Sequence, residues 1–239
     1  MIQVANQFEE TYLALRRKEG RIYSDEEVKW LPTVDPSHPY FAEWRIRKHS
    51  CDKLIRYLRN KKQSLKILEV GCGNGWLCYQ LSKIEHSHVT GIDISKMELK
   101  QAQRIFGKID NLEFLTGKIS DEAIQSRKFD IIIFAASIQY FPSLDETISS
   151  CLQMLNANGE IHILDSYFYS DNEKVAAINR SEEYFQSMGF SQMTQHYFHH
   201  GVQQLQKYNF KMLYNPSWMR RIFRIDKNPF PWVCIMRRY

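Results

Sequence analysis

The 239-residue sequence has few of the features that mark secreted, membrane or zinc-binding proteins. Its five cysteines (Cys51, Cys72, Cys78, Cys151 and Cys234) are odd in number and include no C-x-x-C pair, which argues against a disulfide framework and a zinc site. The N-terminal MIQVANQFEE has neither a basic region nor an apolar core, so we expect no secretory signal. No apolar run approaches the ~18–20 residues of a membrane helix. These absences predict a cytoplasmic protein without a membrane anchor.

Strong charge of either sign is also absent. The net charge is +5, and the basic residues form short clusters that solvated helix faces explain, so we do not expect a nucleic-acid partner. The hydrophobic content of 44% and charged content of 25% are typical of a soluble globular domain.

Glycine is scarce, yet three of the ten glycines stand at alternate positions in GCGNG, as Gly71, Gly73 and Gly75. The preceding LKILEV is almost continuously apolar, as expected of a strand buried on both faces of a parallel sheet. After the glycines, apolar residues recur at helical spacing from Trp76. The segment is therefore predicted to be strand, turn and helix, with glycines that let a ligand approach the backbone at the carboxyl end of the strand.

Two cofactor classes use such a turn. A dinucleotide-binding fold needs G-x-G-x-x-G, and here Trp76 stands at the third glycine position, which weakens that interpretation. The next predicted strand, HVTGID, ends on Asp93, whose carboxylate could accept hydrogen bonds from both hydroxyls of a ribose. Ser95 and Glu98 follow in the pattern of a capping box for the next helix.

The segments LEVGCGNGW, GIDIS, LEFLTGKIS and FDIIIFAASIQYF together resemble the class I S-adenosylmethionine-dependent methyltransferases, in the small-molecule (type 11-like) methyltransferase-domain group. The resemblance runs from about Ile67 to Leu164 and implies that S-adenosyl-L-methionine is the cofactor. It implies that the glycine loop lies against the methionine part, with Asp93 at the ribose and Ile94 at the adenine. The implied cofactor-binding residues are Glu69, Gly71, Cys72, Gly73, Asp93, Ile94, Lys118, Ile119, Ala135, Ala136 and, from an N-terminal helix over the cofactor, Arg45.

Two positions depart from the family pattern. Lys118 stands where the family usually has an aspartate at the adenine, so the backbone of Lys118 and Ile119, or Ser120, would hold that ring. Gln139 stands where many relatives carry histidine, and an amide does not accept a proton near neutral pH. No base is therefore assigned after the fourth strand.

The alternation of strands and helices from Leu65 to Leu164 predicts an α/β fold, a doubly wound, mostly parallel seven-stranded sheet. We expect an N-terminal helical cap with a proline-rich connection over residues 1–39, and a methyltransferase domain over 40–239. The fifth strand is expected at EIHIL, after a helix that Gly159 ends. Residues 166–199 then form an insertion placed as a lid, although 172–188 could instead be the last core helix.

The insertion is rich in aromatic residues and histidine, which favours a small, partly apolar methyl acceptor. The candidate acceptor-binding residues are Gln139, Tyr140, Tyr167 and Tyr169. His196 or His199 is the candidate general base, because imidazole can accept a proton at cellular pH. The pair His196 and His200 has helical spacing but no further metal ligand beside it, so no metal is expected.

Other functions remain open on the sequence. A catalytically silent or RNA-directed cofactor-binding module would share the same glycine loop, whereas a nicotinamide-dependent oxidoreductase is opposed by Trp76. The sequence has no [DNS]PP[YF] tetrapeptide after the fourth strand, which disfavours methylation of an adenine amino group. The acceptor, the oligomeric state and the choice among O-, N- and C-methylation are not determined.

Overall fold

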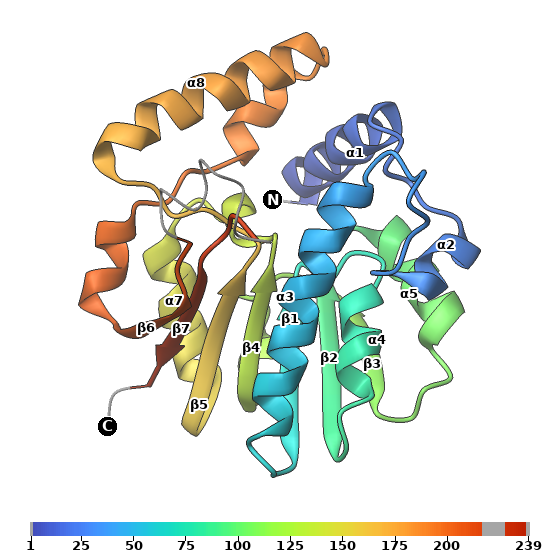
Figure 1. Cartoon of the computed structure of the whole chain (residues 1–239), viewed down its shortest axis with the longest axis vertical. Coiled ribbons are helices and arrows are strands. Elements are labelled where there is room, and N and C mark those ends of the chain that lie inside the picture. Colours follow the sequence, from blue (N-terminus) through green and yellow to red (C-terminus); the bar gives the residue numbers. More distant parts are fainter. Residues whose placement is uncertain (1, 217–227, 238–239) are drawn as a thin grey trace.

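The computed structural model of the chain describes residues 2–216 and 228–237. Seven strands form one sheet in the order β3-β2-β1-β4-β5-β7-β6, in which β7 is antiparallel to both of its neighbours (Figure 1). The predicted mostly parallel, seven-stranded sheet is confirmed. The strands are β1 (Leu65–Val70), β2 (Ser87–Asp93), β3 (Leu112–Thr116), β4 (Phe129–Ala135), β5 (Leu155–Leu164), β6 (Asn209–Tyr214) and β7 (Trp232–Met236).

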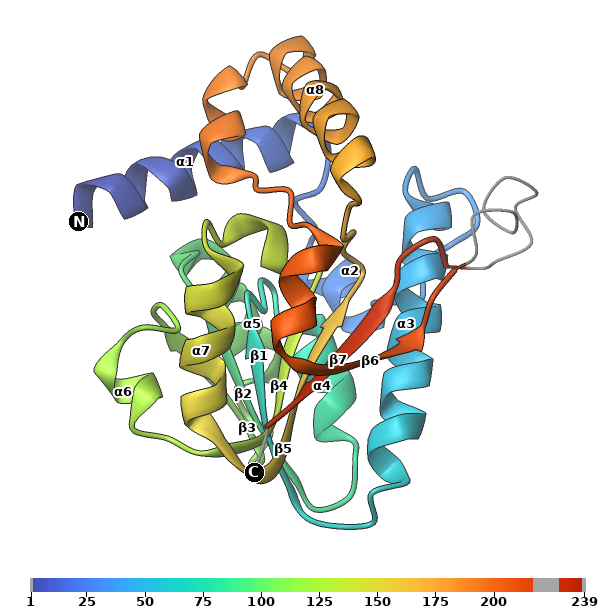
Figure 2. The ribbon, with the colours of Figure 1, turned by 90° about the vertical axis from the view of Figure 1, so that its left-hand side faces the viewer.

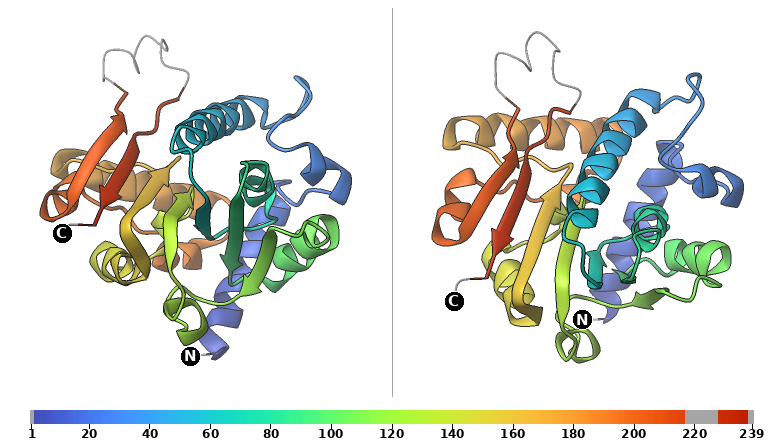
Figure 3. Two further views of the ribbon diagram at one scale, coloured as in Figure 1. Left: turned by 90° about the horizontal axis from the view of Figure 1, so that it is seen from below. Right: turned by 60° about the horizontal axis from the view of Figure 1, so that its bottom comes forward.

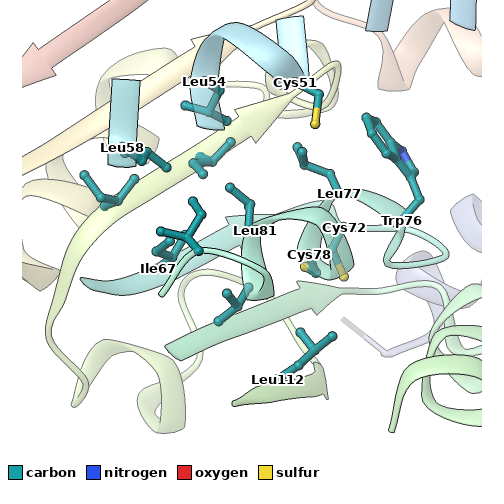
Figure 4. Close-up of a cluster of buried hydrophobic side chains, with 14 of the residues drawn as sticks. Cys51, Leu54, Leu58, Ile67, Cys72, Trp76, Leu77, Cys78, Leu81 and Leu112 are labelled. Carbon is teal, nitrogen blue, oxygen red and sulfur yellow. The ribbon is translucent and has the colours of Figure 1, made fainter. Parts of the chain in front are cut away.

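The central strand β4 illustrates how the sheet is buried on both faces. Ile131 and Ile133 contribute to one hydrophobic core, and Ile132 and Phe134 contribute to the other, because successive side chains of a strand point to opposite faces. Figure 3 shows the sheet between these two layers, and Figure 4 shows part of the first core. The helices of the first core are α3 (Phe41–Arg59), α4 (Trp76–Ser82) and α5 (Lys96–Phe106), and those of the second are α6 (Glu122–Gln125) and α7 (Leu144–Met154).

A third layer covers the carboxyl ends of the parallel strands. It consists of α1 (Ile2–Lys18), α8 (Asp171–Ser187) and the 3₁₀ helix η2 (Ser191–His196), which lie above the sheet in Figures 1 and 2. Its own small core contains Leu15 of α1, Phe185 of α8 and Met193 of η2. The insertion therefore lies over the strand ends, and α8 is not a core helix on a face of the sheet. Its action as a lid stays a prediction.

The residues before α3 bridge two parts of the fold. Beyond α1, the short helix α2 (Asp25–Trp30) packs against α5, where Arg104 Nε donates to Asp25 Oδ2 over 2.6 Å. The proposed boundary at residue 39 stays a prediction, since this segment contacts both the third layer and the sheet-flanking helices. None of the helices within residues 2–216 and 228–237 combines the length and apolar character needed to cross a membrane.

The start of β5 differs from the prediction. The helix before it ends at Met154 and not at Gly159, and β5 begins at once with Leu155. Leu155 pairs with Phe129 of β4, and a register shift lies between Phe129 and Ile131. Regular pairing with β4 resumes only at Glu160, which pairs with Ile131. Gly159 therefore lies in the irregular part of β5, between two paired positions, and does not end a helix. The remaining short elements are η1 (Ile138–Tyr140) and η3 (Val202–Lys207).

Candidate active site

A cavity of about 540 Å³ lies above the carboxyl ends of β1, β2 and β4, beneath α1 and η2. One side is built from the glycine loop, the end of β2 and the start of α5, and it carries carboxyl groups. The opposite side is aromatic. The lining residues are Phe8, Glu9, Tyr12, Val70, Gly71, Gly73, Ile92, Asp93, Ile94, Ser95, Glu98, Gly117, Lys118, Ile119, Ser120, Ala136, Ser137, Tyr140, Phe141, Pro142, His196 and Phe198.

The three glycines of the loop serve different purposes. All three have positive φ, which favours glycine. A Cβ on Gly71 would lie 2.7 Å from Cβ of Ser137, and one on Gly75 would lie 2.6 Å from the ring of Phe114. A Cβ on Gly73 would meet only the carboxyl group of Glu98, at 3.4 Å. Gly71 and Gly75 are therefore fixed by protein packing, whereas Gly73 keeps backbone exposed to the cavity.

Asp93 is anchored by two backbone donors. The N–H of Gly73 donates to Oδ2 over 2.8 Å, and the N–H of Ser95 donates to Oδ1 over 2.8 Å. Burial raises the pKa of Asp93, and these two N–H donors act in the opposite direction. Each carboxylate oxygen has two lone pairs, so both can accept a further hydrogen bond from a ligand in the cavity. Asp93 is thus held in place by the backbone and can accept further hydrogen bonds on both oxygens.

Glu98 corrects an expectation from the sequence. The Ser95 hydroxyl accepts from the N–H of Glu98 over 3.4 Å, but Asp93 takes the N–H of Ser95 that Glu98 would accept in a full capping box. The side chain of Glu98 instead lines the cavity beside Gly73. Its pKa is raised by burial and by the nearby carboxyl group of Asp93. Two carboxyl groups therefore share the side of the cavity that the glycine loop forms.

The loop after β3 forms the edge where the adenine contact was expected. Lys118, Ile119 and Ser120 all line the cavity. The N–H of Lys118, however, donates to Asp121 Oδ2 over 2.8 Å, so Asp121 occupies the donor that adenine would need there. The carbonyl of Ile119 accepts from Gln125 Nε2 over 2.6 Å, so the N–H of Ile119 and the polar groups of Ser120 are the candidates for an adenine contact.

The loop after β4 is held rigidly beside the cavity. Ala136 lines the cavity with φ +54°, a conformation unfavourable for a residue with a side chain, and its N–H donates to the carbonyl of Leu164 over 3.0 Å. Gln139 braces this loop. Its Nε2 donates to the carbonyl of Ala136 over 2.7 Å, and its Oε1 accepts from the hydroxyl of Ser166 over 3.0 Å. Gln139 is thus tied to the protein and is not among the lining residues.

The roof of the cavity is aromatic and joins distant parts of the chain. The ring of Phe8 lies 4.9 Å from the ring of His196, and the ring of Tyr12 lies 5.7 Å from that of Tyr140. Arg16 Nη2 donates to the hydroxyl of Tyr140 over 3.1 Å, which fixes the direction of that hydroxyl. His196 and Tyr140 are the predicted acceptor-side residues that the structure places in the cavity lining.

Several predicted cofactor ligands lie outside the described lining. Glu69 is buried behind the loop and accepts from Cys78 Sγ over 2.8 Å, and burial raises its pKa to about 8. Cys72 is buried in the core next to Cys78 (Figure 4). Arg45 is exposed on α3, and Ala135 is the last residue of β4, one position before the lining begins. Their roles toward a cofactor stay predictions.

Three predicted acceptor-side residues also lie elsewhere. The ring of Tyr167 packs 4.5 Å from Phe230, and Tyr169 pairs with Gly201 in an isolated bridge. His199 faces a different cavity, and its Nε2 lies 2.9 Å from the hydroxyl of Ser181. His196 and His199 thus face different cavities. Between them the chain crosses the loop after β4, where the N–H of Phe198 donates to the carbonyl of Gln139 over 2.7 Å.

One cluster in the described part of the chain brings three metal-ligand types within 4.8 Å, namely Glu160, His162 and Cys234. The indole N–H of Trp232 donates to Nδ1 of His162 over 3.1 Å, so Nε2 carries the proton and donates to Glu160 over 3.1 Å. Lys61 also donates to Glu160, over 2.8 Å. Because both imidazole nitrogens are engaged, hydrogen bonding alone accounts for this cluster. His196 and His200 are not arranged to bind one metal ion together, because Nε2 of His200 donates to the carbonyl of Ile138.

Several residues that complete the cavity were not predicted from the sequence. Phe8, Glu9 and Tyr12 come from α1, and Glu98 was assigned to a capping box. The i, i+4 spacing of Phe8 and Tyr12 was a usable signal for an apolar helix face, but it does not say which surface that face covers. Ser137, whose hydroxyl donates to the carbonyl of Val70 over 2.6 Å, carries no sequence signature.

Comparison with known proteins agrees with this geometry. Residues 61–214 match the methyltransferase domain family. Among curated proteins, the chain is 31% identical over 118 residues to an arsenite methyltransferase of Mus musculus, covering 44% of this chain and 31% of that protein. It is 32% identical over 122 residues to a malonyl-[acyl-carrier protein] O-methyltransferase of Acetivibrio thermocellus, covering 50% of this chain and 42% of that protein. The match spans less than half the length of either relative.

Solved structures share the whole fold at low identity. A magnesium protoporphyrin IX methyltransferase from Synechocystis with bound SAH superposes with a TM-score of 0.61 at 14% identity, covering 99% of both chains. A plantazolicin methyltransferase in complex with a pentazolic desmethylPZN analog and SAH gives a TM-score of 0.55 at 14% identity over 100% of both chains. With residues 61–214 matched by the family, the chain belongs to the methyltransferase domain family and has the fold of the class I S-adenosylmethionine-dependent methyltransferases.

Proposed function

We propose that this protein transfers a methyl group from S-adenosyl-L-methionine to a small, partly aromatic acceptor. The observation that carries the proposal is the division of one cavity into a carboxyl-lined half at the glycine loop and an aromatic half under α1 and η2. The first half suits a cofactor with a ribose and a positive charge. The second half suits an apolar acceptor of limited size.

The residues present fit the cofactor. Gly73 leaves a cradle that a Cβ would begin to fill, and Asp93 has lone pairs directed at a diol. Glu98 places a second carboxyl group where a sulfonium or an ammonium would be attracted. Ile94 and Ile119 both line the cavity, and they would contact the flat ring of the adenine that the resemblance expects there.

The cofactor supplies a methyl group already activated by the positive charge on sulfur. The protein's contribution is then chiefly alignment, since an in-line displacement needs the acceptor atom, the methyl carbon and the sulfur in one line. The rigid loop of Ala136 and Ser137 and the roof residues Tyr140 and Phe141 would hold the acceptor in place. His196, half-buried in the same cavity, is the group that could accept a proton from an acceptor that must lose one.

Binding and labelling experiments together test the proposal. Calorimetry should detect S-adenosyl-L-methionine and its demethylated product, and incubation of the protein with methyl-labelled cofactor and a cell extract should yield a labelled small molecule by mass spectrometry. Cofactor binding without any labelled product would favour a catalytically silent module. Label appearing only in RNA would favour the RNA-directed alternative, and absence of cofactor binding would overturn the proposal.

We also propose that the protein is located in the cytoplasm. All five cysteines are buried free thiols, which suits a reducing, cytoplasmic environment.

A further inference from the structure

A second cavity, of about 370 Å³, adjoins the first. It lies between one face of α8 and the chain that runs from η2 to η3, and it shares Pro142 and Phe198 with the first cavity. These two side chains are the partition between the two spaces. The first and second cavities are therefore direct neighbours.

The walls of the second cavity differ in chemistry from those of the first. Lys174, Ile178 and Ser181 of α8 face it at i, i+4 and i+7, the spacing of one helix face. The opposite wall presents two consecutive buried histidines, His199 and His200. Polar donors therefore converge on this space from two separate elements.

Each of the two histidines has a hydrogen-bond partner at Nε2. Nε2 of His200 lies 3.1 Å from the carbonyl of Ile138, and because a carbonyl only accepts, this nitrogen carries the proton. Nε2 of His199 lies 2.9 Å from the hydroxyl of Ser181. Burial lowers the pKa of both imidazoles, so they are neutral near pH 7 in the absence of a ligand.

The charges around these rings are mainly positive. Lys174 lowers the pKa of both histidines, and Arg180 and His200 also lower the pKa of His199. Carboxylates are present at the periphery, where Asp145 acts on His200 and the exposed Glu182 lies at the cavity wall. Lys174 forms no ion pair with any residue in the described ranges. The cavity thus holds an unneutralised ammonium and two imidazoles that would gain protons beside an anion.

We propose that the second cavity is a subsite for an oxyanion, a carboxylate or phosphate group carried by the methyl acceptor. Lys174 and Ser181 bind the anion from α8, and His199 and His200 bind it from the opposite wall and take up protons as it enters. The inference rests on the proposed function for the role of the acceptor, but anion binding itself does not depend on methyl transfer.

The two cavities then give the acceptor a direction. The first cavity carries three carboxyl groups, those of Glu9, Asp93 and Glu98, and one ammonium, that of Lys118 in the loop after β3. The second cavity carries Lys174 and the two histidines, so it offers an anion more positive or donor groups. An acceptor with an aromatic body and an anionic end would be oriented with the body toward the methyl donor. This arrangement selects amphipathic acids over neutral aromatic molecules.

Histidine ring NMR of the whole protein tests anion binding without any acceptor. Sodium phosphate and sodium acetate are titrated at pH 6.0 and pH 8.0, with sodium chloride at matched ionic strength as the reference, and ring signals are assigned by single His→Gln substitutions. We expect saturable shifts of His199 and His200 with at least one of the two anions, tighter at pH 6.0. Lys174→Gln should weaken binding by at least about tenfold, and Lys108→Gln, an exposed lysine after α5, should not.

Rings that respond to phosphate and acetate no more than to chloride would overturn the proposal, as would unchanged binding in Lys174→Gln. A second measurement addresses the acceptor. The affinities of 3-(4-hydroxyphenyl)propanoate and of its primary amide for the protein are compared. The acid should bind at least tenfold more tightly than the amide, and Lys174→Gln should remove this difference. If anions bind but calorimetry detects no S-adenosyl-L-methionine, the proposed function fails and the anion site stands.

Discussion

The Cβ that Gly71 lacks would lie 2.7 Å from Cβ of Ser137, so the glycine loop and the loop after β4 are in direct contact without space for a methyl group. The hydroxyl of Ser137 reinforces this contact by donating to the carbonyl of Val70 over 2.6 Å. The two loops that form the floor of the cavity therefore act as one rigid unit.

Gly71→Ala should be more damaging than Gly73→Ala. At Gly71 the positive φ and the overlap with Ser137 act together, and we expect a loss of about 2–4 kcal/mol in the free energy of unfolding. At Gly73 only the positive φ is unfavourable, because Glu98 is at ordinary contact distance, so the loss should be about 1 kcal/mol. Urea unfolding measures both values. Equal losses in the free energy of unfolding would show that Ser137 moves away from the added methyl group at little cost.

Asp93→Asn should weaken cofactor binding by roughly 30–150-fold, equivalent to about 2–3 kcal/mol. The amide cannot accept from both Gly73 and Ser95 and also from a ribose, since its NH₂ group is a donor. Calorimetry with S-adenosyl-L-methionine gives the measurement, and Asp110→Asn, at an exposed acid after α5, is the matched control. Unchanged affinity in Asp93→Asn would remove the ribose assignment.

Glu98 should make cofactor affinity depend on pH. Its raised pKa means that it holds its proton in the free protein at a pH where an ordinary glutamate is ionised. A bound sulfonium favours the ionised form, so binding releases a proton and affinity should increase as pH rises through that raised pKa. The demethylated product, which lacks the sulfonium charge, should show a smaller increase.

Glu98→Gln should flatten this pH dependence for S-adenosyl-L-methionine. Calorimetry between pH 6 and pH 9, in buffers of different ionisation enthalpy, reports both the affinity and the protons released. If the variant keeps the slope of the unmodified protein, the released proton comes from another group, with Asp93 the next candidate because burial also raises its pKa.

Glu69 should lower the free energy of unfolding as the pH rises above 4.5. Its folded-state pKa of about 8 lies above the ordinary value of 4.5, so the unfolded chain loses this proton first, and stability falls as pH rises from 4.5 toward 8. Glu69→Gln removes this decline, and relative to the unmodified protein it should gain on the order of 4 kcal/mol between pH 4.5 and pH 8. Glu122→Gln, at an exposed acid on α6, should show no such gain in urea unfolding across the same range.

Substitutions of His196 and His199 should have different effects in a turnover assay. His196 lines the first cavity, so His196→Gln should lower turnover by about 100-fold or more with an acceptor that must lose a proton, while cofactor affinity stays nearly unaltered. His199 faces the second cavity, and His199→Gln should alter the Michaelis constant for the acceptor more than turnover. Full turnover in His196→Gln would leave alignment as the source of catalysis.

Local patterns were sufficient to predict the sheet and the glycine loop. Alternating strands and helices, a continuous apolar run before Gly71 and an acid at Asp93 depend on neighbours close in sequence, and all lie as expected. Glu98 shows where such reasoning stops. The capping pattern was present, but Asp93 competes for the N–H of Ser95, and only the three-dimensional contact decides which carboxyl group obtains it.

The roof and the second cavity were beyond prediction for a related reason. Phe8 meets His196, and Lys174 faces His199, through contacts between segments far apart in the chain. Aromatic and histidine-rich composition indicated that the insertion bears on the site. It could not distinguish His196 from His199, because three residues of extended chain carry them into different spaces.

The position of α1 in the roof has a consequence for synthesis on the ribosome. Tyr12 and Leu15 find their partners in Tyr140, Phe185 and Met193, which are made much later. At about 5–20 residues per second, the nascent chain would carry this helix without its partners for roughly 10–40 s. The apolar face of this amphipathic helix would be accessible to chaperones for that time. The newly made protein would acquire the third layer over its cavity only as the last third of the chain emerges.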